Sequence, residues 1–305
     1  MLNAALHLLL VLAAPPLLLG VIGRTKAAFA GRSGPPLLQP YHDLVRLFRK
    51  GSVLSRTTTG IFLVGPVLAF TAPLAASLLV PFGGLKAPVS FTGDLILFAY
   101  LFALSRFFTA AAALDTGSAF EGMGAAREVS FSCLAEPALF FGLIAIARIS
   151  GSLSLAPMLA HPWSLGWLTS GASLVLVVAS WFVVLLAENS RIPFDDPNTH
   201  LELTMIHEVM VLDHSGPSLG LILYGSSIKL FVLGALLMRV AIPFGSASPW
   251  LSGLVFLSGM LLLAILIGVV ESVMARIRLV GVPQLLVTAC LLSAFGMLLL
   301  VRIAP

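Results

Sequence analysis

The feature that most constrains the fold is a series of apolar stretches, each about 20 residues long. A helix needs about that length to cross a bilayer, and each unsatisfied backbone group in hydrocarbon costs several kcal/mol. Because long unbroken apolar runs favour helices over the strands of a closed barrel, the sequence predicts an all-α polytopic membrane protein, a bundle of about eight transmembrane helices. The predicted spans are roughly 4–23, 60–81, 94–114, 131–149, 165–188, 217–239, 250–272 and 282–303.

The composition indicates that lipid is the surrounding solvent. Of the 305 residues, 59% are hydrophobic and 10% are charged, and the mean hydropathy is +1.06. A soluble domain of this composition would expose apolar surface that one core could not bury. We therefore expect residues 1–305 to form a single integral membrane domain. Cys133 and Cys290 lie in separate apolar runs without a CxxC pair, so neither a disulfide framework nor a thiolate metal site is supported.

The distribution of Lys and Arg predicts the orientation. Inward loops of membrane proteins are enriched in these residues, and the first predicted loop contains seven of the 17. We therefore expect both termini on the outer side of the cell (cytoplasmic) membrane, with a first span that stays in the mature protein. The pI of about 9.4 then reflects topology rather than nucleic-acid binding. The predicted inward loops, which would form a partner-docking face, are 24–59, 115–130, 189–216 and 273–281.

Ionisable residues are concentrated in the stretch AENSRIPFDDPNTHLELTMIHEVMVLDHSG, residues 187–216. It contains six of the 13 acids and three of the six histidines. Pro197 and the Thr199-x-x-Glu202 spacing predict a helix start, with a short surface helix continuing through LELTMIHEVMVLD. A zinc site of the HExxH type fails, because Val211 stands where the second histidine would be. No span carries the paired histidines of a membrane haem, so we expect no redox centre in this chain.

Three charged residues lie within or near the ends of predicted spans: Arg106, Glu136 and Lys229. An ionised group facing lipid costs ~2.5 to 3.5 kcal/mol on the insertion scale, so these side chains should face the bundle interior or a wet cavity. A buried ion pair or a side chain reaching toward the interface would also explain them. Glu136, directly before Pro137, is a candidate proton-relay group.

The predicted third loop, between the third and fourth spans, forms a second acidic cluster with Asp115, Glu121 and Glu128 beside Arg127. A solvated loop with a local Arg–carboxylate pair would also account for it. Its GMG sequence is only a fragment of a GxGxxG pattern, and no strand precedes it, so nucleotide binding is weakly supported.

The first loop predicts a short amphipathic helix from Gln39 onward, because apolar and charged residues alternate with helical spacing through DLVRLFRK. Contact with anionic lipid would explain such a helix. Docking of a soluble partner is the sharper alternative.

The stretch from Ala187 to Pro217, together with GRSGPPLLQPYHDLVRLFRK in the first loop and the eight-span layout, resembles the membrane subunit of energy-converting, membrane-bound nickel-iron hydrogenases of the formate hydrogenlyase and hydrogenase-4 type. That family is related to subunit 1 of respiratory complex I. The resemblance covers most of the chain. In complex I, further acids commonly follow the proline of this motif, whereas this sequence has Asn198 and His200, which favours the hydrogenase branch.

The resemblance implies a non-catalytic anchor subunit of an oxidoreductase complex. Its partners would be a nickel-iron large subunit, an iron-sulfur small subunit and antiporter-like membrane subunits, with the nickel-iron centre and the iron-sulfur clusters in those partners and no cofactor in this chain. The residues predicted for a proton path are Asp115, Glu121, Glu128, Glu136, Glu188, Glu202, Glu208 and Lys229. Those predicted for docking or for ordering the loop are Arg32, Gln39, Asp43, Arg191, Asp195, Asp196 and His200. Two alternatives stay open: a quinone-site subunit of complex I, and a stand-alone cation or proton transporter.

Overall fold

The computed structural model describes residues 2–160, 163–195, 205–243 and 248–303. Within these ranges the chain is helical and has no β-strand, and eight helices are long and apolar enough to cross a membrane, so the predicted all-α bundle is confirmed. The long helices are α1 (Leu2–Phe29), α3 (Gly60–Ser77), α4 (Asp94–Asp115), α5 (Ala119–Ser150), α7 (Trp163–Glu188), α8 (Gly216–Ala241), α9 (Pro249–Val273) and α10 (Gly281–Ile303). The short elements are α2 (Gln39–Phe48), α6 (Leu155–Ala160) and the 3₁₀ turn η1 (Glu208–Val211).

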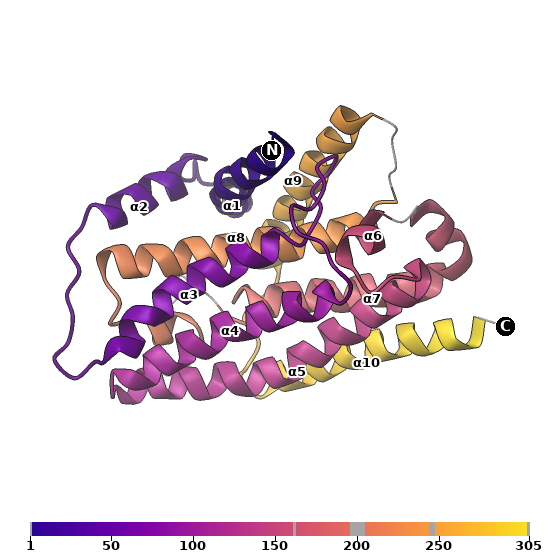
Figure 1. Ribbon diagram of the computed structural model, residues 1–305. Helices are drawn as coiled ribbons and strands as arrows, with labels where there is room; N and C mark the ends of the chain where they lie inside the picture. Colours follow the sequence, from indigo (N-terminus) through magenta and orange to yellow (C-terminus); the bar gives the residue numbers. More distant parts are fainter. Residues whose placement is uncertain (1, 161–162, 196–204, 244–247, 304–305) are drawn as a thin grey trace.

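Helix α8 forms the centre of the bundle. In the most apolar 18-residue segment of α8, 72% of the residues are buried. The corresponding share in the other spans is 28–44%. Helix α3 packs on α4 and α8, α10 packs on α5 and α7, and α1 packs on α9 and α8 (Figure 1). In lipid, helices associate through close packing rather than hydrophobic burial, which favours small residues at contacts. Gly225 is such a contact, because a Cβ there would lie only 2.1 Å from the carbonyl oxygen of Ala69.

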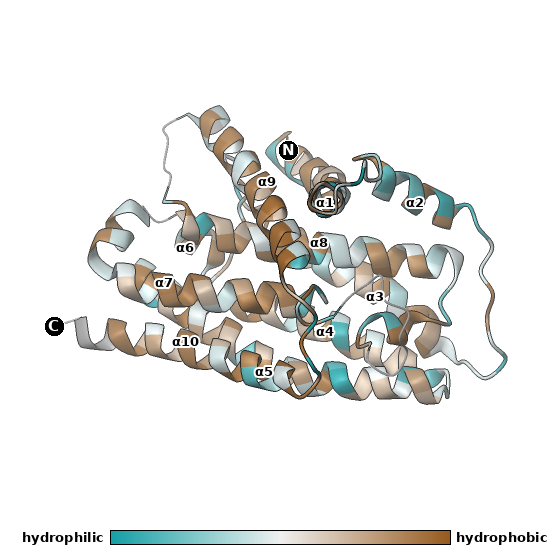
Figure 2. Cartoon of the chain, turned by 180° about the vertical axis from the view of Figure 1, so that it is seen from behind, coloured by the Kyte–Doolittle hydropathy of each residue, from teal (hydrophilic) through white to brown (hydrophobic). Residues whose placement is uncertain are grey.

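The two ends of the bundle differ in character. One end, here called the α2 end, carries α2, the loop after α7 and η1; the opposite end carries α6 (Figure 1). Hydrophilic residues gather on α2, whereas α7 and α9 are largely hydrophobic (Figure 2). Helix α2 occupies the predicted amphipathic segment and leaves Val45 and Phe48 exposed. The Tyr41 hydroxyl donates a hydrogen bond to the carbonyl of Ala13, which fastens α2 to α1.

Helix α5 begins earlier than the sequence predicted. The interval 115–130 is a loop only up to Ser118, and residues from Ala119 onward belong to the 32-residue α5. Glu121, Arg127 and Glu128 lowered the local hydropathy and hid this part of the helix, but Glu121 is buried against protein rather than solvated. The glycine pattern has a packing role, since a Cβ on Gly124 would lie 2.9 Å from the carbonyl oxygen of Ile206.

The sequence predicts a surface helix through LELTMIHEVMVLD, residues 201–213. The described part of this segment, residues 205–213, does not form that helix. From Met205 to Asp213 the only helical element is the turn η1. The carboxylate of Asp195 accepts hydrogen bonds from the backbone N–H groups of Ile206 (3.0 Å) and His207 (3.1 Å). The side chain of Asp195 therefore holds both of these amides.

Candidate functional site

Arg106, near the middle of α4, is the hub of a buried set of charges. Its Nη2 donates to both oxygens of Glu188 at the end of α7, with the longer contact at 2.6 Å, and its Nη1 donates to Glu136 on α5. Its Nε lies 3.7 Å from Glu128, which is an electrostatic contact too long for a hydrogen bond. The side chain of Arg106 is only 8% exposed, so these carboxylates replace the water that an ionised guanidinium would otherwise bind.

Lys229 on α8 completes the set. Its Nζ lies 2.8 Å from Glu188, so Glu188 bridges two cations that come from different helices. We call Arg106, Glu128, Glu136, Glu188 and Lys229 the central cluster. It joins four helices and contains three carboxylates against two cations. Charged side chains inside a membrane bundle usually pair and often mark ion pathways.

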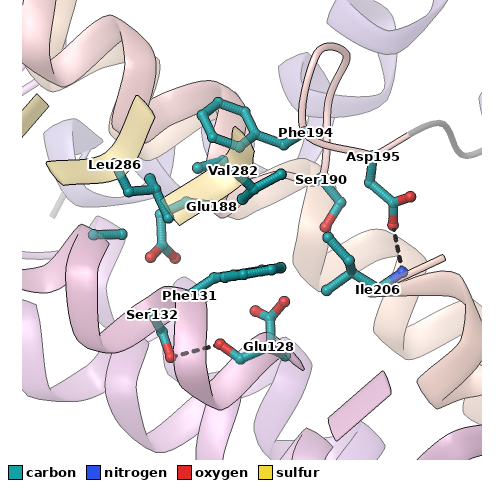
Figure 3. A pocket seen from close by; sticks show the side chains of 12 residues that line it. Glu128, Phe131, Ser132, Glu188, Ser190, Phe194, Asp195, Ile206, Val282 and Leu286 are labelled. Carbon is teal, nitrogen blue, oxygen red and sulfur yellow. Dashed lines mark hydrogen bonds between the residues drawn. The ribbon is translucent and has the colours of Figure 1, made fainter. Parts of the chain in front are cut away.

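Polar cavities adjoin the central cluster. Figure 3 shows one with about 370 Å³ of empty volume, in which Glu128 and Glu188 lie near the ring of Phe131. A second, of about 460 Å³, is lined by all cluster members except Glu136, and also by His207 and Ser226. Several of these lining residues are polar, as a cavity must be to hold water against charged groups.

A larger cleft lies at the α2 end, between α1, α2 and α8. Its empty volume is about 1550 Å³. His207 and Ser226 line both this cleft and the second cavity, so they connect the cleft to the central cluster. Predicted residues Asp43 and Glu208 also line it.

A separate group of ion pairs fixes the loop after α7. Glu271, near the end of α9, has a fully buried side chain that contacts Lys26 (2.8 Å) and Arg191 (3.4 Å). Asp195 contacts Arg276 at 2.9 Å. We call Lys26, Arg191, Asp195, Glu271 and Arg276 the loop anchor. Arg191 and Asp195 thus contact side chains near and after the end of α9, and their roles in docking or loop ordering stay predictions.

Besides Glu208, which lines the large cleft, two other described acids predicted for the proton path lie outside the central cluster. Asp115 caps the start of α3, since it accepts hydrogen bonds from the backbone N–H (2.6 Å) and hydroxyl (2.8 Å) of Thr59. Glu121 accepts a hydrogen bond from the backbone N–H of Asp213 at 2.9 Å. Both carboxylates therefore have local structural partners at the α2 end.

The remaining predicted residues lie at the surface of the α2 end or outside the described ranges. Gln39 donates to Asp43 at 2.9 Å within α2, and Arg32 is exposed in the preceding loop. Asp196, His200 and Glu202 lie outside the described residues.

Some residues with clear structural roles had a weak signal in the sequence. Glu271 is one acid near the end of a very apolar helix, and only the fold reveals its two cationic partners. Asp94 is the first residue of α4, at the end of the bundle that carries α6. Its carboxylate accepts from the Ser154 hydroxyl (2.7 Å) and the Leu155 backbone N–H (2.6 Å), and thereby caps α6.

Burial lowers the pKa of two histidines of the loop region. Burial lowers the pKa of His207, and Lys229 acts in the same direction while Glu128 opposes it. Burial also lowers the pKa of His214 to about 4, against a smaller opposing effect of Asp213. The ring of His214 stacks on Phe62 with centroids 4.0 Å apart.

Cofactor ligands are not gathered in the described ranges. There, no group of three or more His, Cys, Asp or Glu side chains is placed to hold a metal ion. Cys133 and Cys290 are unpaired thiols on different helices.

Comparison with known proteins identifies the family. A family model described as NADH dehydrogenase matches residues 2–302, nearly the whole chain. The chain belongs to this family. Hydrogenase-4 component C of Escherichia coli (strain K12) is 32% identical over 269 residues, which cover 86% of this chain and 84% of the relative. Formate hydrogenlyase subunit 4 of the same organism is 31% identical over 291 residues, 91% of either chain.

The family also includes subunits of NADH-quinone oxidoreductases. One such subunit, from Polaromonas naphthalenivorans (strain CJ2), is 27% identical over 221 residues, covering 68% of this chain and 60% of the relative. A chain of the membrane-bound sulfane sulfur reductase, an archaeal respiratory membrane complex, superposes with a TM-score of 0.82 over 98% of both chains at 23% identity, which shows the shared fold. The resemblance found in the sequence is thus confirmed, and the chain is a multi-pass membrane protein.

Proposed function

We propose that this chain is the membrane-anchor and ion-coupling subunit of a hydrogenase complex with several subunits. Its α2 end docks a peripheral arm with a nickel-iron large subunit and an iron-sulfur small subunit, and its central cluster contributes to a proton path. The observation that carries the proposal is Glu188, which lies between Arg106 and Lys229 in the bundle and immediately precedes the loop that would face the arm.

The proposed path begins at the cleft of the α2 end. From there His207 and Glu208 lead to the cavity that contains Glu128 and Glu188, because His207 lines both spaces. Arg106 then connects Glu188 to Glu136. Asp115 and Glu121 are left outside this path, since each carboxylate is held by local partners instead.

The chemistry of transfer follows from the contacts. The carboxylate of Glu188 has two cationic partners, which stabilise its ionised form, whereas Glu128 makes only a long contact with Arg106. A proton that arrives on Glu128 can therefore be accepted without breaking a hydrogen bond to Arg106. Protonation of Glu188 releases Lys229, so a change at the docked arm that moves either cation would alter proton affinity along the path.

Docking is supported by charge and shape at the α2 end. Exposed cations follow α2 and the adjoining loops, while α2 itself is fixed on α1 and α8. Such a surface can attract an acidic face of a soluble subunit. The exposed cations are Arg32, Arg46, Arg49, Lys50 and Arg56. Gln39, Asp43, Asp196 and His200 stay predicted members of this surface, and Glu202 stays a predicted member of the path.

The proposal assigns the redox chemistry to the partners. The nickel-iron centre and the iron-sulfur clusters belong to the arm, and this chain binds no cofactor. The α2 end faces the cytoplasm and both termini face outward, because the first loop contains seven of the 17 Lys and Arg residues.

The test is Glu188→Gln in the complete complex, reconstituted in vesicles with a pH-sensitive dye. Hydrogen oxidation with an artificial electron acceptor should remain within about two-fold, because the arm still docks. Coupled proton movement should fall at least about ten-fold, since a neutral amide cannot carry the proton.

Glu121→Gln is the matched control, since it removes a buried carboxylate that contacts none of the cluster residues in the described structure. Unchanged proton movement in Glu188→Gln contradicts the path, and equal losses in both variants contradict the assignment to the central cluster. If the arm fails to bind in either variant, docking at the α2 end and proton transfer through the central cluster are not separate functions.

A second candidate, a quinone-site subunit of respiratory complex I, is favoured by the 1550 Å³ cleft, which combines apolar residues of α1 and α2 with charged residues. Substituting Leu47, which lines the cleft, by Trp should then abolish quinone reduction and leave hydrogenase activity with an artificial acceptor unchanged.

The stand-alone cation or proton transporter is tested with the purified chain alone. If this chain conducts ions in vesicles without other subunits, the transporter function replaces the hydrogenase subunit and the quinone-site subunit.

A further inference from the structure

Glu136 differs from the rest of the central cluster in its exposure. Its side chain is 43% exposed, whereas those of Arg106, Glu128, Glu188 and Lys229 are 7–14% exposed. It faces a cleft between α4 and α5 with about 570 Å³ of empty volume, lined also by Tyr100 and Phe140. Helix α5 lies at an edge of the bundle in Figure 1, with α4 and α10 beside it.

The depth of Glu136 makes this exposure costly. It lies 14 residues before the end of α5 at Ser150, which corresponds to about 21 Å along a helix that rises 1.5 Å per residue. With Ser150 at one face of a hydrocarbon layer about 30 Å thick, Glu136 lies about 9 Å from the other face, which is more than a glutamate side chain can span. Lipid chains at this position would offer no hydrogen-bond donor, and an ionised group that faces lipid is disfavoured.

The charge balance of the cluster points the same way. Three carboxylates face two cations, so one negative charge is not matched inside the cluster. The most exposed carboxylate is the one at the open cleft. A group from outside that donates a hydrogen bond to Glu136 would therefore cover the exposed carboxylate and stabilise its negative charge.

We propose that the α4–α5 face binds a transmembrane helix of a different membrane subunit, which presents a hydrogen-bond donor side chain to Glu136. Tyr100 and Phe107, each 65% exposed on α4, supply apolar contact surface for that helix. A second copy of this chain is a poor occupant, because a two-fold contact would bring the same surplus negative charge from both chains to one interface. The inference rests on the proposed function in one respect, namely that the chain works within a membrane complex of several subunits.

The exposed face of α9 provides the contrast. Leu254 and Leu262 are 65% and 59% exposed there, and acyl chains can cover such side chains without loss of a polar contact. Both faces expose large apolar side chains. Of the two, the α4–α5 face also exposes a carboxylate of the central cluster.

The test is site-specific photo-crosslinking in the complete complex, with p-benzoylphenylalanine at Tyr100 and, as the matched control, at Leu254. Mass spectrometry should map the Tyr100 product to a transmembrane segment of another subunit, within about one helical turn of a side chain that donates hydrogen bonds. Leu254 should give no product with that segment. Products only with lipid, with a second copy of this chain or with a soluble subunit overturn the proposal.

Two variants test the role of Glu136 itself. Glu136→Leu should lower the amount of that subunit that co-purifies by at least about ten-fold, equivalent to ~1.4 kcal/mol, whereas Glu136→Gln, whose amide oxygen still accepts a hydrogen bond, should stay within about two-fold. If both variants retain the same amount of that subunit, the proposed hydrogen bond from a donor side chain to Glu136 is wrong. Both measurements are made without turnover, so they are independent of the loss of proton movement expected for Glu188→Gln.

Discussion

The central cluster and the loop anchor contain the same kinds of side chain but have opposite charge balance. The cluster has three carboxylates and two cations, whereas the anchor has two carboxylates, Asp195 and Glu271, and three cations. The surplus cation of the anchor is tolerated because Lys26 and Arg191 line the large cleft, with side chains 26% and 16% exposed. The surplus negative charge of the cluster has no such cleft at the α2 end, because Glu136, its most exposed carboxylate, faces the cleft between α4 and α5.

This difference agrees with a structural role for the loop anchor and with the coupling role proposed for the central cluster. Groups that can turn toward a wide cleft keep their charge and hold the loop in place. Groups surrounded by helices must be neutralised by a partner or a proton, so their protonation responds to small movements. Residues 188–195 divide between the two: Glu188 belongs to the cluster, while Arg191 and Asp195 belong to the anchor.

Removal of the hub should have the largest effect. Arg106→Leu leaves three carboxylates with Lys229 as the remaining cation, and we expect the free energy of unfolding to fall by about 3–5 kcal/mol. Reversible unfolding in mixed micelles with increasing SDS measures the change. Arg106→Lys, which keeps the charge but loses the planar fork, should lose less. If Arg106→Leu loses under about 1 kcal/mol, the cluster is not a tightly coupled unit.

The connection between η1 and α8 should open more readily in acid. The pKa of His214 is about 4 in the fold and about 6.5 when the segment is open, so the open form binds the extra proton as pH falls below 6.5. Its free energy of opening should therefore be about 2 kcal/mol lower at pH 5 than at pH 7. Hydrogen exchange of residues 205–216, corrected for intrinsic rates, measures this.

His214→Phe is the control, because the new ring can still stack on Phe62 but does not titrate. Burial also lowers the pKa of His207, so a smaller dependence of the same sign should remain. A pH dependence as large as that of the original protein would exclude His214 as its source.

Within the anchor, Glu271→Gln should cost only about 1 kcal/mol, since Lys26 and Arg191 can turn toward the cleft. Its effect should be local, with faster hydrogen exchange of residues 189–195 and unchanged exchange around Glu136. Lys26→Gln should have a smaller effect, because Arg191 still contacts Glu271. A loss as large as that of Arg106→Leu would remove the distinction between the two regions.

The smallest effect is expected for Glu136→Gln in the chain purified alone. The side chain is 43% exposed and belongs to the group with surplus negative charge, so the free energy of unfolding should change by less than about 0.5 kcal/mol. Unfolding in the same SDS titration compares it with Glu188→Gln, which disrupts two ion pairs and should cost more. Equal losses would mean that Glu136 is held as tightly as Glu188.

The sequence was most informative where one physical requirement dominates. Length and apolarity predicted the eight spans, and helical spacing predicted α2 at Gln39–Phe48. The start of α5 was placed too late, because hydropathy cannot tell a polar residue in a loop from one buried in a helix, as Glu121 is. The contact of Arg106 with Glu188 could not be predicted, since 82 residues separate them and the helix packing alone brings them together.

The sequence by itself determined the membrane class, the number of spans and the acidic motif that placed the chain in its family, because these depend on hydropathy and on local residue order. Only the tertiary structure decided which charges meet. It assigned Glu188 to the central cluster, Asp195 to the loop anchor and Asp115 to a helix cap. The physical reason is that an ion pair depends on the distance between helices and on burial, and neither quantity can be obtained from the order of residues along the chain.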